Sequence, residues 1–214
     1  MLKGYAAIVG SRNTPEVILE YMIRLGRTLT DEGYAISSGD AYDADRAGWY
    51  GAIQSRKFSE VGCRIFVNKS YRNGYPIRSF TGFIDSRNFT GTQPLAEAIA
   101  LKARGTFAGL NKWGIELHTR NVYQILGTTL EERVDICILY APTVGKDRVT
   151  GGTNTAYQIA KTAGVPTIIN LYVKEDLEWA KAYLADYEQD YPYIDIDWHE
   201  IHKPDDPRLK DFEE

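Results

Sequence analysis

Residues 5–52 read "YAAIVGSRNTPEVILEYMIRLGRTLTDEGYAISSGDAYDADRAGWYGA", and this stretch decides the fold class. Two short apolar runs, at 5–10 and 34–39, each end in glycine and then turn polar. Such runs are typical of buried parallel strands. Between them, apolar residues recur at helical spacing over 17–29, and Gly33 marks the end of that helix. The stretch therefore predicts a strand, a helix and a second strand.

The same alternation continues along the chain. A helix is expected over 43–57, followed by a strand over 63–68. Later expected elements are helices at 94–104, 120–126, 153–164 and 174–188, and strands at 134–140 and 166–171. Because right-handed crossovers place successive strands in one sheet, the predicted fold class is α/β: a doubly wound, mostly parallel, Rossmann-like sheet with helices on both faces.

The domain organisation follows from length and composition. The chain has 214 residues, which suits a single domain. We assign 1–190 to one nucleotide-phosphate-binding domain and 191–214 to an acidic C-terminal extension. Within the domain, residues 69–117 form an insertion rich in aromatic and basic residues, expected to act as a lid or cap. One further strand is expected near the C-terminal end.

The distribution of charge and the two cysteines indicate which ligands the protein suits and which cell compartment it occupies. Residues 186–214 hold eleven acidic and three basic residues, whereas the body has a small positive excess that suits phosphate ligands. The competing interpretation is that the acidic C-terminal end only makes the protein more soluble and that the lysine and arginine side chains are scattered over the surface. Cys63 and Cys137 sit in apolar runs and are expected to be buried, reduced thiols. No apolar run of membrane-spanning length and no signal sequence is present, which predicts a cytoplasmic protein without a membrane partner.

Three polar loops follow strand ends and carry the predicted chemistry. In open α/β sheets, ligands bind beyond the carboxyl ends of the strands. Unpaired N–H groups at helix starts attract anions there, glycine allows close approach, and arginine can pair with two oxygens. These loops predict a phosphate or nucleotide site, although turn closure and helix capping explain any one loop alone. The proposed residues are Gly10, Ser11, Arg12, Ser38, Gly39, Asp40, Arg120, Asn121, Gly151, Gly152, Thr153 and Thr155.

Common motifs are absent from the sequence. The stretch "VGSRNTP" is not the G-x-G-x-x-G fingerprint, and no P-loop occurs. A classical dehydrogenase and a P-loop phosphotransferase are therefore not expected, and no cofactor is assigned. His199 and His202 do not form the H-E-x-x-H pattern, so no metal site is expected. His118 is expected only to pack against neighbouring side chains and to have no functional role.

Four blocks together resemble the DNA-processing protein A family (DprA, also called Smf), within the Rossmann-like superfamily that includes the Lonely Guy phosphoribohydrolases. The blocks are "AIVGSR", "SSGDAYDADRAGWYGA", "HTRNVYQILG" and "VTGGTNTAYQIAKTAGVPTI", and their order and spacing agree with the family pattern over about half of the chain. The matching residues are Gly10, Ser11, Arg12, Ser38, Gly39, Ala41, Asp43, Ala47, Gly51, Ala52, Arg120, Asn121, Ile125, Gly127, Gly151, Gly152, Thr155 and Ala156.

The resemblance implies binding of single-stranded DNA or of a nucleotide in DNA processing or recombination, and a homo-oligomer, expected to be a dimer. Asp40 and Tyr42 depart from the family pattern, and the 69–120 stretch is unlike the family's core. No winged-helix domain follows, so a small stand-alone relative, such as a phage or mobile-element protein, is expected. The aromatic residues of 69–113 would then stack on bases.

The alternative is a small-nucleotide sensor or sequestering protein, or a nucleotide N-glycosidase of the phosphoribohydrolase kind, using the same loops. The Lonely Guy pattern places a glutamate after its glycine-rich turn, whereas Gln158 occupies that region here. Asp40, Asp43 and Asp45 remain candidate catalytic acids, with Asp43 also expected to cap the second helix. The sequence leaves open whether this protein is an enzyme and leans against it.

Overall fold

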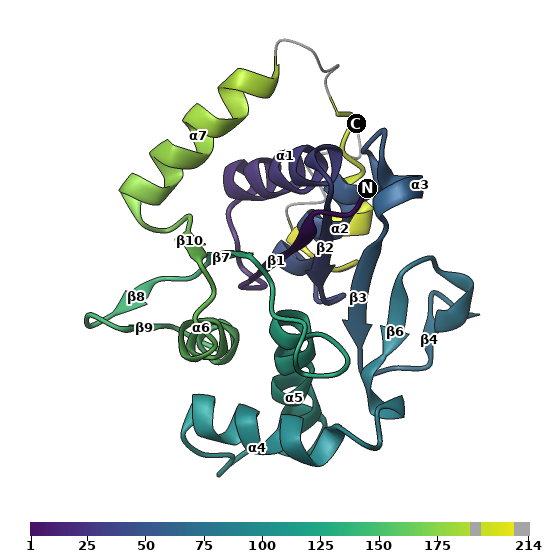
Figure 1. The fold of residues 1–214 in the computed structure, drawn as a ribbon, viewed down its shortest axis with the longest axis vertical. Helices are drawn as coiled ribbons and strands as arrows, with labels where there is room; N and C mark the ends of the chain where they lie inside the picture. The colour runs from purple at the N-terminus through teal and green to yellow at the C-terminus, as the bar shows by residue number, and fades with distance from the viewer. Residues whose placement is uncertain (189–193, 208–214) are drawn as a thin grey trace.

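The computed structural model describes residues 1–188 and 194–207 and confirms the α/β architecture (Figure 1). Its central sheet has six parallel strands in the order β10-β7-β1-β2-β3-β6. These strands are β1 (Gly4–Gly10), β2 (Tyr34–Ser38), β3 (Cys63–Val67), β6 (Phe83–Asp85), β7 (Ile136–Tyr140) and β10 (Thr167–Asn170). The chain builds outward from β1 in one direction and then returns to add β7 and β10 on the other side.

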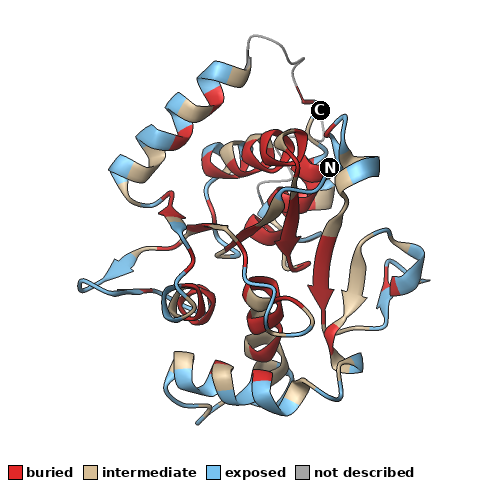
Figure 2. Cartoon of the chain, in the orientation of Figure 1, coloured by how far each residue is buried: buried red, intermediate tan, exposed pale blue. Residues whose placement is uncertain are grey.

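Helices cover both faces of the sheet. The main helices are α1 (Glu16–Glu32), α2 (Ala44–Ile53), α4 (Gln93–Arg104), α5 (Lys112–Leu126), α6 (Thr153–Thr162) and α7 (Lys174–Glu188). Alternate residues of β1 face opposite sides: Ala6 and Ile8 join the core under α1 and α2, whereas Ala7 and Val9 join the core under α5 and α6. Most of the central strands and the helix sides that face them are buried, whereas the edge strand β6 is half-buried (Figure 2).

Short elements complete the fold. They are α3 (Phe58–Val61), α8 (Trp198–Ile201), the 3-10 turns η1 (Ile77–Ser79) and η2 (Ser86–Asn88), and the antiparallel pairs β4 (Tyr71–Arg72) with β5 (Tyr75–Pro76) and β8 (Thr143–Val144) with β9 (Arg148–Val149). Gly33 ends α1 in the left-handed conformation, with φ 102°, as predicted.

The second helix is shorter than predicted. It ends at Ile53 rather than at 57, and the separate turn α3 follows. The reason is tertiary: Asp31 of α1 accepts hydrogen bonds from the Ser55 hydroxyl and the Arg56 N–H, at 2.8 and 3.1 Å. These bonds hold the chain in a turn at the point where the helix would have continued.

The segment over 69–117 elaborates the core, as expected, and much of it joins the central sheet and the helical layer. Strand β6 extends the central sheet beside β3, and α4 and the first turn of α5 continue the helical layer. The α5 helix begins at Lys112 rather than at 120, with the Asn111 side chain accepting a hydrogen bond from the Gly114 N–H. Several of its aromatic rings fill the interior: Phe83 packs against Trp49, and Phe89 against Phe66.

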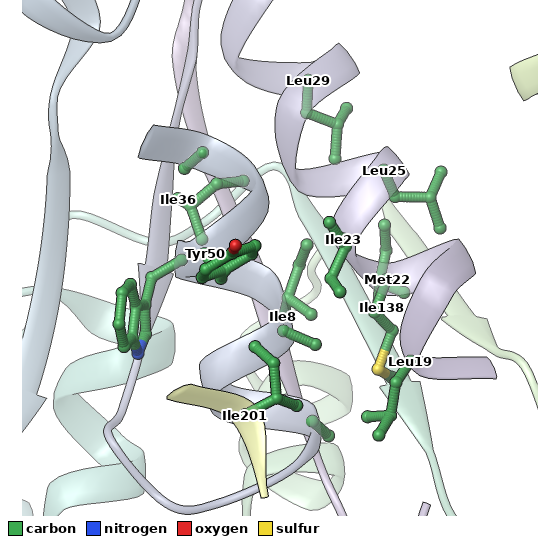
Figure 3. Close-up of a cluster of buried hydrophobic side chains, with 14 of the residues drawn as sticks. Ile8, Leu19, Met22, Ile23, Leu25, Leu29, Ile36, Tyr50, Ile138 and Ile201 are labelled. Carbon is green, nitrogen blue, oxygen red and sulfur yellow. The ribbon is translucent and has the colours of Figure 1, made fainter. Parts of the chain in front are cut away.

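The C-terminal extension joins the main body where the structure describes it. Residues 194–207 carry the short helix α8 and no strand, and the predicted strand otherwise falls on residues outside the described ones. Ile201 is fully buried and belongs to the same hydrophobic cluster as Ile8, Leu19 and Met22 (Figure 3). The acidic segment is therefore anchored by an apolar face rather than being only a solvated tail.

Both cysteines are free, as predicted, and Cys137 is buried while Cys63 is half-buried. Burial raises the pKa of each thiol to about 12, so neither is a ready nucleophile. Among the described residues, no helix combines the length and apolar character that crossing a membrane requires.

Candidate functional site

A cleft of about 440 Å³ lies at the carboxyl ends of β1 and β7, where the strand order reverses. The loop after β1 (10–13), the loop after β2 (41–45), one side of α5 (110–124) and the turn before α6 (150–153) line it. Because the strand order reverses at this point, the loops that follow the two strands lie apart and leave a crevice between them. Ligands of open α/β sheets generally bind in such a crevice. Its volume is in the range of small-molecule sites.

Two glycine-containing loops form the polar side of the cleft. At Gly10 a Cβ would come within 2.7 Å of the Ala44 Cβ and 3.2 Å of the Tyr140 carbonyl oxygen, so only glycine lets these loops approach so closely. Gly151 adopts φ +68°, a conformation that favours glycine, and Gly152 occupies the N-cap position of α6. The N-terminus of α6 therefore lies at the cleft, where the helix dipole favours an anion, and the Asn154 and Thr155 N–H groups donate to the Gly151 and Gly152 carbonyls at 3.2 and 3.1 Å.

An acid and a guanidinium group form the floor of the cleft. The Asp45 side chain is 4% exposed, and its Oδ2 lies 3.0 Å from Nη2 of Arg120. Gln124 donates a longer hydrogen bond to the same oxygen at 3.5 Å. Burial raises the pKa of the Asp45 carboxyl above its ordinary value, and the charge of Arg120 offsets this only in part. Asp45 is thus a buried acid that faces a ligand-sized space.

The α5 helix and the residues just before it supply an apolar and aromatic wall. Leu110, Trp113 and Leu117 line the cleft, and Trp113 is 53% exposed. The Arg12 guanidinium lies 5.7 Å from the centre of the Trp113 ring, so a cation and an indole meet across the cleft. One side of the cleft is therefore apolar and aromatic, and the opposite side, formed by the glycine-containing loops, is polar.

His118 also lines the cleft, further along α5. Its Nδ1 forms a 2.8 Å hydrogen bond with the Thr155 hydroxyl, which fixes the ring. Burial, followed by the charges of Arg104 and Arg120, lowers the pKa of His118, which favours the neutral imidazole. The expectation that His118 only packs is therefore incomplete, because the ring is held at the cleft surface.

The structure brings most of the predicted phosphate-binding residues together. The cleft is lined by Gly10, Ser11, Arg12, Arg120, Asn121, Gly151, Gly152 and Thr153, together with the candidate acid Asp45. Asn121 donates a hydrogen bond to the Gly152 carbonyl at 3.3 Å, which ties α5 to the turn before α6. Thr155 lies behind this surface, almost fully buried, and acts through His118.

Ser38 and Gly39 lie behind the cleft rather than in its lining. The Ser38 hydroxyl is fully buried and donates to the backbone carbonyl of Ile8, so it serves the strand pairing. A Cβ on Gly39 would come within 2.7 Å of Arg120 and of Gln124 and would also collide with Asp45. This glycine therefore shapes the floor of the cleft from behind.

Asp40 belongs to a different group of charges, which we call the Asp40 cluster: Asp40, Arg46, Lys69, Arg72 and Glu200. The Asp40 carboxylate is 1% exposed and lies 2.6 Å from Lys69 Nζ, 3.2 Å from Arg46 Nε and 3.3 Å from Arg72 Nε. Arg72 also pairs with Glu200 at 2.7 Å. Because its oxygens already face three cations, Asp40 serves the fold and does not face the cleft.

Asp43 differs from its predicted role as well. It occupies the position before α2, but its side chain makes no capping hydrogen bond. Instead its Oδ2 accepts from the Thr14 N–H at 3.2 Å and its Oδ1 lies 2.9 Å from Nδ1 of His202. With φ 67°, the backbone turns this carboxylate away from the first turn of α2 and toward the C-terminal segment.

Sequence reasoning missed two polar residues of the site: His118 as a lining residue, and Gln124. Gln124 lies four residues after Arg120, which places both side chains on one face of a helix and could have suggested a pair. Trp113 belongs to the aromatic residues of 69–113 that are expected to stack on bases, and it lines the cleft. Comparisons with protein-family models, with curated proteins and with solved structures found no match to this chain.

Proposed function

We propose that this chain binds a nucleotide through its phosphate group, in the cleft between β1 and β7. The observation that carries the proposal is the convergence of Arg12, Arg120 and two glycine-containing loops at the reversal of strand order. The charged side chains that line the cleft are two guanidinium groups and one carboxyl, an excess of one positive charge. One phosphate group complements that excess.

Arg120 supports the proposal further. It is 7% exposed and lines the cleft, with its guanidinium group 3.0 Å from Asp45, so a buried positive charge borders the ligand-sized space. The Trp113 wall gives the base a stacking surface next to the Arg12 guanidinium.

The size of the cleft favours one nucleotide unit, and the DprA-like motif blocks favour DNA processing as the context. A terminal nucleotide of single-stranded DNA and a free mononucleotide share this chemistry. The experiment is calorimetric titration with the four 5′-mononucleotides, inorganic phosphate and a short oligothymidylate, each at two salt concentrations. Oligonucleotide binding that falls steeply with salt supports DNA as the ligand. Tight mononucleotide binding with little salt dependence supports a small-nucleotide protein.

The outcome that contradicts the proposal is the absence of saturable binding by every phosphate-bearing probe. A thermal-shift measurement checks the result independently. A ligand at 100 times its dissociation constant stabilises the folded state by about 2.7 kcal/mol, which shifts the melting temperature measurably.

A second candidate function is hydrolysis of the N-glycosidic bond of the bound nucleotide, and the position of Asp45 favours it. Its raised pKa suits a carboxyl group that holds a proton for a leaving base. Asp45 would give its proton to the base as the bond from C1′ to the base breaks, water would add to C1′, and the proton lost by that water would return to the Asp45 carboxylate. The test is chromatographic detection of free base, with Asp45→Asn expected to abolish release while mononucleotide binding persists.

A further inference from the structure

A second group of ligating side chains lies outside the residues that line the cleft. Asp43, His202 and Asp206 each place one ligand atom within 4.8 Å of the others. Asp43 comes from the loop before α2, and the other two come from the segment after α8. Segments distant in sequence therefore meet around a shared point, and one of the three groups is an imidazole.

The imidazole is fully buried and its orientation is fixed. The His202 ring stacks on Trp198, with centroids 5.1 Å apart and an interplanar angle of 10°. Its Nδ1 faces Asp43 Oδ1 at 2.9 Å. Its Nε2 lies 3.4 Å from Glu16 Oε1 and has no hydrogen-bond partner among the described residues. Both ring nitrogens thus face carboxylates.

The contacts of the two His202 ring nitrogens match the usual surroundings of a metal-binding histidine. Such a histidine coordinates through one nitrogen and directs its other N–H to a carboxylate, which sets the tautomer. Here Nδ1 faces the carboxylate of Asp43, while Nε2 faces Glu16. The Thr14 N–H donates to the other oxygen of Asp43, which holds that carboxylate in place.

Charge favours a cation at this point. Three carboxylates, those of Glu16, Asp43 and Asp206, surround one imidazole, and Asp43 is 1% exposed. Carboxylates bind metals readily in buried sites. A dication would be attracted by all three carboxylates, in addition to the partners that Asp43 and Asp206 already have within the protein.

We propose that Asp43, His202 and Asp206 bind a divalent transition-metal ion, with Zn²⁺ as the best fit. One imidazole nitrogen and two carboxylate oxygens suit Zn²⁺ better than Mg²⁺, which prefers oxygen ligands and keeps most of its water. Binding through Nδ1 releases any proton on that nitrogen to solvent and leaves the remaining ring proton on Nε2, which lies 3.4 Å from Glu16 Oε1. This assignment departs from the sequence analysis, which expected no metal site.

The site is structural and independent of the proposed nucleotide function. It would link the C-terminal segment to Asp43, which lies between two cleft residues, Ala41 in the loop before α2 and Asp45 in the first turn of α2. The ion would therefore stabilise the attachment of the C-terminal segment and, through the loop, the floor of the cleft.

The test is calorimetric titration of the full chain, freed of metal by chelation, with ZnCl₂. We expect saturable binding of one ion per chain. Co²⁺ absorption bands provide a second readout of the ligand set. Asp206→Asn and His202→Gln are expected to lower Zn²⁺ affinity by more than the roughly 10–100-fold that loss of an outer-shell partner causes.

The chain offers matched controls. His199 and Asp205 are exposed neighbours of the same residue types, so His199→Gln and Asp205→Asn should leave Zn²⁺ affinity unchanged. Because buried His202 also contributes to packing, the half-buried Asp206 provides the variant that is expected to stay folded, as circular dichroism would check. Absence of saturable Zn²⁺ binding to the unaltered chain, or equal losses in the control variants, would overturn the proposal.

Discussion

The cleft and the Asp40 cluster are built from the same kind of sequence but serve different purposes. Each lies where a strand ends in small polar residues before a helix, and each combines arginines with a buried aspartate. In the cleft, Arg120 meets the single carboxyl of Asp45, and Arg12 remains exposed beside open space. In the Asp40 cluster, three cations close around Asp40, and Glu200 completes the arrangement.

The difference shows that motif position alone does not identify a ligand site. What separates the two regions is whether open space adjoins the paired charges. The Asp40 carboxylate has three cations within 3.3 Å and lines no part of the cleft, whereas Asp45 and Arg120 border a volume of about 440 Å³. The predictions below test this division between a region that holds the fold and a region that holds a ligand.

The largest expected effect is on folding, from Asp40→Asn. The variant removes the counter-charge of Arg46 and Arg72, whose side chains are 7% and 5% exposed. Uncompensated buried charges of this kind lower the free energy of unfolding by about 3–5 kcal/mol. Urea unfolding measures this change. Mononucleotide affinity of the folded fraction should stay the same.

Asp147→Asn is the control for that experiment, because Asp147 pairs with Lys161 at an exposed position and its loss should leave stability unchanged. If Asp40→Asn instead weakened mononucleotide binding and left the unfolding curve in place, Asp40 would belong to the ligand site and the division would be wrong.

Arg12→Ala should weaken ligand binding without changing stability, which is the reverse of the effect expected for Asp40→Asn. Arg12 is exposed, so the free energy of unfolding should hardly change. Loss of its charge-assisted hydrogen bonds should weaken binding of a phosphate ligand by about 1.5–3 kcal/mol, as titration with inorganic phosphate or a mononucleotide measures. Arg78→Ala, at an exposed arginine far along the sequence, is the matched control. Equal affinity of Arg12→Ala and the unaltered protein would remove Arg12 from the site.

Gly39→Ala tests the floor of the cleft from behind. The added Cβ would displace Asp45, Arg120 and Gln124, because it would lie within 2.7 Å of the latter two. Overpacking of this kind lowers the free energy of unfolding by about 1–3 kcal/mol, and the shifted Arg120 should also weaken mononucleotide binding. Gly91→Ala is the control, since a methyl group added there would meet no atom within 4 Å beyond its chain neighbours. A variant with unchanged affinity would show that the floor does not contact the ligand.

The smallest expected effect is a change in pH dependence from Asp45→Asn. Burial raises the pKa of Asp45 above 3.8, so at intermediate pH the folded state binds this proton more often than the unfolded state does. The Asp45 contribution to the free energy of unfolding therefore falls as pH rises from 3.8 through the folded-state value. Urea unfolding across this range should show that fall in the unaltered protein but not in the variant. Identical pH profiles would mean that the Asp45 pKa is not raised.

Much of the fold was predictable because it rests on local periodicity. The alternation of apolar runs and helical spacing over residues 5–52 correctly placed β1, α1 and β2. The glycine-containing turns and Arg120 were also predictable as cleft residues, since the ends of parallel strands share one edge of the sheet. Residues 69–117 were less predictable, because β6 is only three residues long and its pairing with β3 is decided by contacts across the sheet.

By itself, the sequence determined the class of the fold, the edge of the sheet where polar loops gather and the residue types available there. These properties follow from the chemistry of neighbouring residues along the chain. Only the tertiary structure decided which acids face the cleft, because Asp40, Asp43 and Asp45 lie within six positions yet have different partners. Their roles depend on Lys69, Arg120 and His202, which arrive from distant segments when the chain packs. Charge pairing in a folded protein is set by such long-range contacts, and no local pattern encodes them.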